Sequence, residues 1–385
     1  MAEEDATGTP KVMDTGATGR GKLTRRAFLA RAAATTAVAV GTSSLFAACD
    51  TPPGFGIVIM MSVQSVQDRT NSITLVAGKR TIVRVFPETN GENNPDVTRI
   101  SGELLIFAGD QTGVTPLRKL LPLNGPISSH SGPKINPDNP DHSLDFEIPL
   151  ALLTGMDLTV RANLGSAAGA TAQYQDTLKF QPITKTETVA PVLIQPTLYA
   201  STAPTMANFW SSLNGAIKRL PVPQGRYIVK PPTMWATDRP MTTNNDFYWV
   251  SMDLVLHFFN VFGGDYPAGI VTPPGVLGSS ATLGIANLGP GGSVVAFGVG
   301  NVVSLDMAES VFGHEFSHHY GLKHAAGCGS PADIDPSLPK ATDKTGMDVP
   351  RRLVIPTGTS ELMTYCGFPH WPSSVTYSQL LTGVK

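Results

Sequence analysis

Residues 314–324 read His314-Glu315-Phe316-Ser317-His318-His319-Tyr320-Gly321-Leu322-Lys323-His324 and contain three closely spaced histidines and one more beside them. His314 and His318 lie four residues apart, and side chains at this spacing share one face of a helix, about 5–6 Å apart. Two imidazoles placed in this way can bind one metal ion at about 2.0–2.1 Å. We therefore expect a helix over about residues 306–320 with a metal site on one of its faces.

His324 reaches the same ion only if that helix ends before it. On a continuing helix, a residue six positions after His318 would point to the far side. Gly321 lies between them, and glycine adopts the left-handed conformation that ends helices without steric cost. We therefore expect the helix to stop at Gly321 and His324 to return to the metal.

Glu315 has the position of a catalytic base. Three histidine ligands leave a fourth position for water, which is typical of a catalytic zinc site rather than a structural one. Glu315 is rotated by about 100° from His314 around the helix, so it does not share the coordination direction. It can reach the bound water and take its proton as the water attacks a carbonyl. The residues predict one catalytic Zn²⁺ with Glu315 as general base.

The same eleven residues match the extended zinc motif of the metzincins, which are zinc endopeptidases. At this composition, the five fixed positions recur by chance on the order of once in 10⁵ chains. Downstream, Ser360–Cys366 resembles the metzincin Met-turn, in which the residue matching Met363 packs beneath the ligands. Tyr365 matches a tyrosine of astacins and serralysins, so the resemblance implies that it stabilises the oxyanion. The alternative is a tyrosine packed on the cleft wall.

The resemblance also implies a strand for substrate binding. In metzincins, an edge strand above the zinc helix pairs with extended substrate, which is binding by strand addition. By its order in the chain, Val294–Val299 is the candidate for this strand.

The fold class expected is a multi-domain chain. Residues 50–56 read as a linker, and residues 57–186 contain short apolar runs split by turn residues, which predict an antiparallel β-sandwich. Leu144, Phe146 and Ile148 alternate with Asp145 and Glu147. This pattern predicts a strand with one buried and one solvent-exposed face. This part resembles the immunoglobulin-like domains that precede some bacterial metallopeptidases.

From residue 190 to residue 385 the pattern changes to strands alternating with amphipathic helices, with Val189-Ala190-Pro191 as the expected junction. Met206, Phe209, Leu213 and Ile217, for example, recur at helical spacing. The pattern predicts an α/β (α+β) domain, and the resemblance implies the metzincin catalytic domain.

Residues 1–49 read as a signal peptide. The pair Arg25-Arg26 lies in a segment that resembles the twin-arginine export signal, and a weakly apolar run follows it. The run ends in Leu45-Phe46-Ala47-Ala48-Cys49, which resembles a lipobox with Cys49 as the lipidated residue. A lipobox usually has leucine where this chain has Phe46. Export and membrane anchoring through Cys49 are therefore expected, with free secretion as the alternative.

The two other cysteines are expected to pair. An exported chain meets an oxidising compartment, where a disulfide is the default. Cys328 follows His324 by four residues and Cys366 follows Met363 by three. A bridge between them would join the loop of the third ligand to the Met-turn. In the chain-entropy picture, closing such a loop stabilises the fold by roughly 4 kcal/mol.

The remaining observations limit the function. The net charge is -2 and no basic stripe occurs, so nucleic-acid binding is not expected. His319 is expected beside the ligands or at the surface, and the other histidines have no partner at ligand spacing: His130, His142, His257 and His370.

The leading hypothesis is a zinc endopeptidase that cleaves extracytoplasmic proteins or peptides. One alternative is a surface-binding lipoprotein with a non-catalytic zinc site. Another is a zinc hydrolase of non-peptide amides or an exopeptidase. The sequence predicts no oligomeric state.

Overall fold

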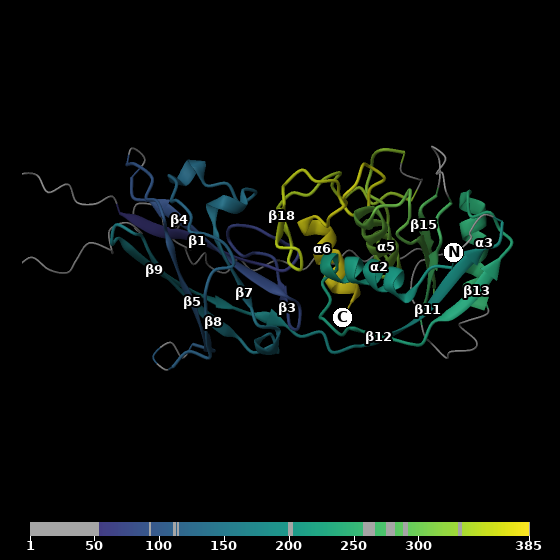
Figure 1. Cartoon of the computed structure of the whole chain (residues 1–385), viewed down its shortest axis with the longest axis horizontal. Helices are drawn as coiled ribbons and strands as arrows, with labels where there is room; N and C mark the ends of the chain where they lie inside the picture. Colours follow the sequence, from purple (N-terminus) through teal and green to yellow (C-terminus); the bar gives the residue numbers. More distant parts are fainter. Residues whose placement is uncertain are drawn as a thin grey trace, which may run out of the picture. The chain divides into compact units, whose positions relative to one another are not determined.

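The computed structural model describes residues 54–384, except 92–93, 111–112, 114, 199–202, 257–265, 275–281, 288–291 and 330–332. These residues form a mixed α/β structure with several β-sheets (Figure 1). Arg25, Arg26 and Cys49 of the expected signal peptide lie outside the described residues, as does His257. Within the described ranges, no helix has the length and apolar character that crossing a bilayer requires.

Two antiparallel sheets make up the N-terminal part, with strand orders β1-β4-β7 and β6-β5-β8-β9. Their strands are β1 (Phe55–Val63), β4 (Thr81–Thr89), β5 (Ser101–Ala108), β6 (Arg118–Leu120), β7 (Leu144–Ile148), β8 (Leu158–Gly165) and β9 (Thr171–Leu178). Both sheets contribute buried apolar side chains to one core, among them Val83, Phe146 and Val160. The short strands β3 (Leu75–Val76) and β10 (Phe180–Gln181) pair in parallel beside this core.

On the outer face of β7, Asp145 is buried and Glu147 is half-buried, although the alternation predicted a solvent-exposed face. Asp145 is only 7% exposed, and its carboxylate lies 3.3 Å from the guanidinium of Arg84 on β4. The hairpin of β17 (Thr345–Asp348) and β18 (Leu353–Ile355) supplies Met347 and other apolar side chains that pack on this sheet. The predicted exposure was wrong for Asp145, because this residue pairs with Arg84 and a hairpin from the far end of the chain packs on the same sheet.

The C-terminal part is built on a sheet with strand order β12-β11-β14-β16-β15, in which β13 also pairs with β11. Its strands are β11 (Glu187–Pro196), β12 (Tyr227–Val229), β13 (Thr233–Thr237), β14 (Tyr266–Val271), β15 (Gly284–Ala286) and β16 (Val294–Phe297). All pairings are parallel except that of β15 with β16, which is antiparallel. Among the described strands, β15 therefore forms the edge, and the predicted edge strand Val294–Val299 was wrong because β16 lies between β14 and β15.

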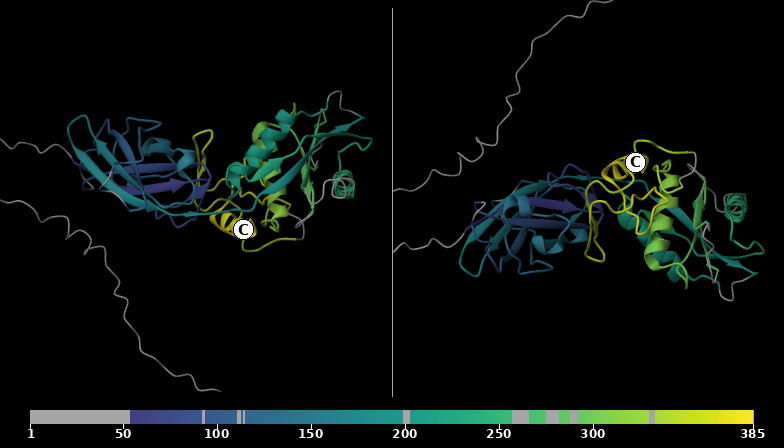
Figure 2. Two further views of the ribbon diagram at one scale, coloured as in Figure 1. Left: turned by 90° about the horizontal axis from the view of Figure 1, so that it is seen from below. Right: turned by 90° about the horizontal axis from the view of Figure 1, so that it is seen from above.

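Helices cover both faces of this sheet. On β16, Val294 and Ala296 share a core with α2 (Met206–Arg219) and α5 (Leu305–His319), while Val295 and Phe297 pack with α3 (Asn244–Leu254). This division follows from the two-residue period of a strand. Helices α2 and α5 lie side by side (Figure 2). The last helix is α6 (Ser374–Gly383).

Side chains cap the first turns of these helices. Thr205 before α2, Thr243 before α3 and Ser304 before α5 each accept a hydrogen bond from a backbone N–H of the first turn. Such caps satisfy donors that a helix start otherwise leaves without partners.

The N- and C-terminal parts are joined by more than the chain between them. The expected junction Val189-Ala190-Pro191 lies inside β11, and residues 52–385 form one compact unit. The short strand β2 (Val66–Gln67), which follows β1, pairs antiparallel with β17. The two parts thus share a small sheet, β18-β17-β2.

Candidate metal centre

Helix α5 ends where the ligand spacing requires it to end. Gly321 has a φ of 87°, in the left-handed region that glycine adopts without strain. Its N–H donates to the carbonyl of His318, and the N–H of Leu322 donates to the carbonyl of Ser317. This is the hydrogen-bond pattern of a Schellman helix end. The turn sends the chain back, so that His324 lies beside His314 and His318.

Each of the three imidazoles is held by its Nδ1 atom. Nδ1 of His314 lies 2.8 Å from the carbonyl oxygen of Leu362, and Nδ1 of His318 lies 2.7 Å from that of Leu322. Nδ1 of His324 lies 2.9 Å from Oδ1 of Asp333. Because these oxygens only accept hydrogen bonds, each Nδ1 carries the proton and each Nε2 keeps a lone pair.

The three Nε2 atoms face one another. Nε2 of His318 lies 3.2 Å from that of His314 and 3.0 Å from that of His324. Lone pairs at this distance repel unless a cation lies between them. Tetrahedral bonds of about 2.0–2.1 Å would place such nitrogens about 3.3 Å apart. All three histidines are buried, so this cluster fits a metal ion.

His314 and His318 are neutral, as metal binding would require. Burial, with the nearby His318 and His324, holds the pKa of His314 well below its ordinary value. Burial also lowers the pKa of His318 to about 4, with His324 contributing. Imidazoles that are neutral near pH 7 can bind a cation without first losing a proton.

Glu315 lies in the wall of the site at 6% exposure. Burial raises the pKa of its carboxyl to about 8. A bound cation would act in the opposite direction and favour the carboxylate. A Cβ atom added to Gly284 on β15 would lie 2.9 Å from Oε1 of Glu315 and 2.8 Å from Cγ1 of Val311. The absence of a side chain at Gly284 therefore leaves the space that Glu315 occupies.

We call residues Ser360–Cys366 the Met363 turn. The N–H of Thr364 donates to the carbonyl of Glu361, and Met363 is fully buried. Two successive carbonyl groups of the turn accept hydrogen bonds from the segments that carry the histidines. That of Leu362 accepts from His314, and that of Met363 accepts from the N–H of Ala325, the residue after His324. The turn thus contacts the site through its backbone as well as through Met363.

Tyr365 points its hydroxyl at the ligands. The hydroxyl oxygen lies 2.9 Å from Nε2 of His324, and the ring is stacked on His314 at a centroid distance of 5.7 Å. Burial, with the charge of Glu315, raises the pKa of Tyr365, so its hydroxyl remains a donor. A donor here can stabilise negative charge that develops beside the metal position.

The predicted disulfide is present between Cys328 and Cys366. The two Cα atoms are 5.1 Å apart. The bridge joins the loop after His324 to the end of the Met363 turn. The thiols are therefore not available as metal ligands.

A cavity of about 630 Å³ opens over these residues. One wall is β15, another is α5 with its ligands, and a third contains Tyr365, Phe368 and His370. Residues Gly284–Ala286 of β15 line this cavity, and no described strand pairs with the outer side of β15.

The other histidines that the structure describes lie off the candidate metal position. His319 packs against Tyr266 and lies 3.7 Å from the carboxylate of Glu187. A ring nitrogen of His370 hydrogen-bonds to the carbonyl of Cys366. The rings of His130 and His142 contact each other in the N-terminal part, with a tilt of 34° between their planes.

Sequence reasoning missed Asp333 and Gly284. Neither carries a local signal, because Asp333 meets His324 through a loop and Gly284 meets Glu315 through sheet order.

No protein-family model matches the chain, and no curated protein matches it either. Among solved structures, the chain is similar to metalloproteinase-II from Bacteroides fragilis, with a TM-score of 0.30 and 10% identity over 81% of this chain and 84% of that one. It is also similar to a polysaccharide deacetylase from Bacillus cereus, with a TM-score of 0.18 and 12% identity over 52% of this chain and 58% of that one. Both scores are too low to establish a shared fold, so the chemistry of the site rests on this chain's own residues.

Proposed function

We propose that this chain is a zinc endopeptidase of the metzincin type that hydrolyses peptide bonds of extracytoplasmic proteins. The observation that carries the proposal is the set of three Nε2 lone pairs that converge from His314, His318 and His324. Glu315 adjoins the first of these ligands, and the Met363 turn supports them from below the site. The N-terminal sandwich is proposed to be immunoglobulin-like.

The residues fit the chemistry of peptide hydrolysis. When bound, a zinc ion lowers the pKa of water towards about 7 and polarises the carbonyl of the scissile bond. Glu315 then accepts the proton of the attacking water at a carboxylate oxygen and passes it to the leaving amine nitrogen. The hydroxyl of Tyr365 donates a hydrogen bond to the oxyanion that forms on the former carbonyl.

The substrate backbone is proposed to bind along β15. Strand addition requires an edge whose N–H and C=O groups are unpaired, and β15 lines the cavity beside Glu315. This replaces the strand predicted from the sequence, Val294–Val299, with Gly284–Ala286. An extended peptide here would bring its scissile carbonyl between Glu315 and Tyr365.

The site of action is proposed from the sequence alone. Arg25, Arg26 and Cys49 support twin-arginine export and a lipid anchor at the cell envelope. Replacing both arginines by lysine should leave precursor in the cytoplasm, and mass spectrometry should find diacylglycerol on Cys49. An unmodified mature N-terminus elsewhere would leave simple secretion.

The test of the proposed activity compares full-length wild type, Glu315→Gln and Tyr365→Phe on an unstructured protein substrate. Glu315→Gln should lower kcat by about 10²–10⁴-fold, because the base is lost while all three ligands remain. Its zinc content should equal that of wild type. Tyr365→Phe should lower kcat by about 10²–10³-fold with little change in KM, because one oxyanion donor is lost. Undiminished cleavage by Glu315→Gln would refute the mechanism.

A further inference from the structure

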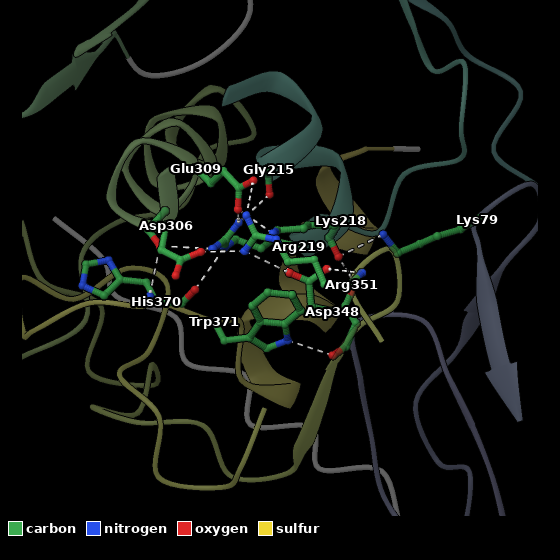
Figure 3. A network of polar contacts seen from close by, with 12 residues as sticks. Lys79, Gly215, Lys218, Arg219, Asp306, Glu309, Asp348, Arg351, His370 and Trp371 are labelled. Atoms are coloured by element: carbon green, nitrogen blue, oxygen red, sulfur yellow. Dashed lines mark hydrogen bonds and ion pairs between the residues drawn. The ribbon is translucent and has the colours of Figure 1, made fainter. Parts of the chain in front are cut away.

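Arg219, the last residue of α2, joins three segments of the chain. It is 1% exposed. Its Nη1 donates to the carbonyl of Gly215 at 2.8 Å, its Nη2 to Oγ of Ser310 on α5 at 3.1 Å, and its Nε to the carbonyl of His370 at 3.0 Å (Figure 3). A planar guanidinium can serve these acceptors together, whereas an ammonium group presents one point of donation.

Ser310 completes this clamp on the backbone of His370. Its Oγ accepts from the N–H of His370 at 3.2 Å, so both polar backbone groups of His370 are bound. Ser310 lies four residues before His314, and side chains at this spacing share a helix face. The clamp therefore connects the face of α5 that carries the first ligand to the segment that follows the Met363 turn.

The clamped segment forms part of the metal centre. It runs from the Met363 turn through Phe368 and His370, which line the cavity. The ring of Trp371 lies 5.0 Å from the guanidinium of Arg219. Because the carbonyl of Leu362 orients His314, a shift of this segment along α5 would turn the first ligand.

Two glycines bring α2 close enough for the clamp to form. A Cβ atom added to Gly215 on α2 would lie 2.3 Å from Cβ of Glu309 on α5. One added to Gly313 would lie 3.3 Å from Cδ of Arg219. The side chain of Arg219 thus passes directly over the residue that precedes His314.

The N-terminal part holds the end of α2 from the other side. Oγ of Ser65, which precedes β2, donates to the carbonyl of Lys218 at 2.7 Å, and Nζ of Lys79 donates to the carbonyl of Ile217 at 2.7 Å. The carbonyl of Ser65 also accepts from Nε1 of Trp371 at 2.8 Å. These residues occupy carbonyls that the end of a helix otherwise leaves without partners.

We propose that Arg219 is a positioning residue for the metal centre, an inference that rests on the proposed function. By binding Ser310 and the carbonyl of His370 together, it fixes the segment after the Met363 turn against α5 and so fixes His314. Ser65 and Lys79 hold α2 in the position that this clamp requires. The N-terminal sandwich is therefore a support of the metal centre and not a separate module.

The test uses Co²⁺ as a spectroscopic probe bound to the full-length protein. Arg219→Lys keeps the positive charge near Glu309 but loses the planar set of donors. It should unfold cooperatively, raise the Kd for Co²⁺ by about tenfold or more, and change the shape of the visible absorption band. Ser310→Ala, which removes a single hydroxyl, should change the Kd and the spectrum in the same direction. If Arg219→Lys does not fold, the result for Ser310→Ala tests the inference by itself.

Arg351→Met is the matched control. Arg351 lies in the same group of charges, with its guanidinium 2.9 Å from the carboxylate of Glu309 and 2.5 Å from that of Asp306. Its ion pairs are with Asp306, Glu309 and Asp348 and not with the His370–Ser310 contact, so its loss should leave the Kd and spectrum unchanged even if it lowers Tm. Wild-type Kd and spectrum in folded Arg219→Lys and Ser310→Ala, or equal weakening in Arg351→Met, would overturn the inference. A wild type that binds no metal at all would instead refute the proposed function.

Discussion

Two buried polar clusters meet on α5, and they differ in how their hydrogen-bonding groups are satisfied. Around Arg219, the nitrogens of Arg219, Lys218 and Lys79 each face an oxygen of the same chain. Among His314, His318 and His324, the inner nitrogens face one another and only the outer ones have acceptors. The cations of the first cluster have their partners within the fold, so this cluster acts as a scaffold. The second could be completed by a cation, which is why we propose it as a metal-binding site.

The largest effect is expected from removing a ligand. His324→Ala leaves two inner nitrogens, so zinc affinity should fall by more than the roughly 10–100-fold typical of losing an outer hydrogen-bond partner, and cleavage should fall to background. Elemental analysis of the purified protein measures this. His319→Ala is the control, because His319 contacts Tyr266 and Glu187 instead of the metal position. Full zinc occupancy in His324→Ala would remove it from the ligand set.

A smaller effect is expected from filling the space above the base. In Gly284→Ala, the added methyl group displaces the carboxylate of Glu315, which is the flexible partner in that contact. A displacement of about 1 Å should lower kcat by about 10²-fold, while zinc content stays at the wild-type level. Gly367→Ala serves as control, because nothing lies within 4 Å of its added Cβ atom. Equal kcat values for the two variants would contradict the assigned position of Glu315.

The smallest effect concerns the scaffold and appears as a pH dependence of stability. Burial lowers the pKa of Lys79 from 10.5 to about 7, against the opposing effect of Asp348. Between these values the unfolded chain binds the proton that the folded chain has released, so this group makes the free energy of unfolding rise with pH. From pH 7 to pH 9, wild type should gain about 2 kcal/mol relative to Lys79→Met. Parallel profiles in chemical denaturation at the two pH values would contradict this.

The sequence predicted the part of the site that depends on local geometry. The four-residue spacing of His314 and His318 and the position of Gly321 determine how three imidazoles converge, and both act within a few residues. The pairing of Cys328 with Cys366 was predicted from the expected export to an oxidising compartment and the expected lipidation of Cys49. In each of these predictions, the residues involved allowed only a few alternative arrangements.

The features that the sequence did not predict depend on contacts between segments that are distant in the chain. Whether β15 or β16 forms the edge is decided by the order of strands in the sheet, which a strand's own residues do not encode. Asp145 alternates like a solvent-facing residue, yet the β17–β18 hairpin covers its sheet. Arg219 looks like an ordinary basic residue at a helix end, and its role depends on Ser310 and His370.

The central claim is that the three inner nitrogens hold one zinc ion. Crystals of the purified full-length protein, with diffraction recorded on both sides of the zinc absorption edge, test it most directly. The account predicts a single anomalous peak about 2.0–2.1 Å from Nε2 of His314, His318 and His324, with Glu315 beside it and not bonded to it. No zinc peak among these nitrogens, in protein that retains its activity, would contradict the account.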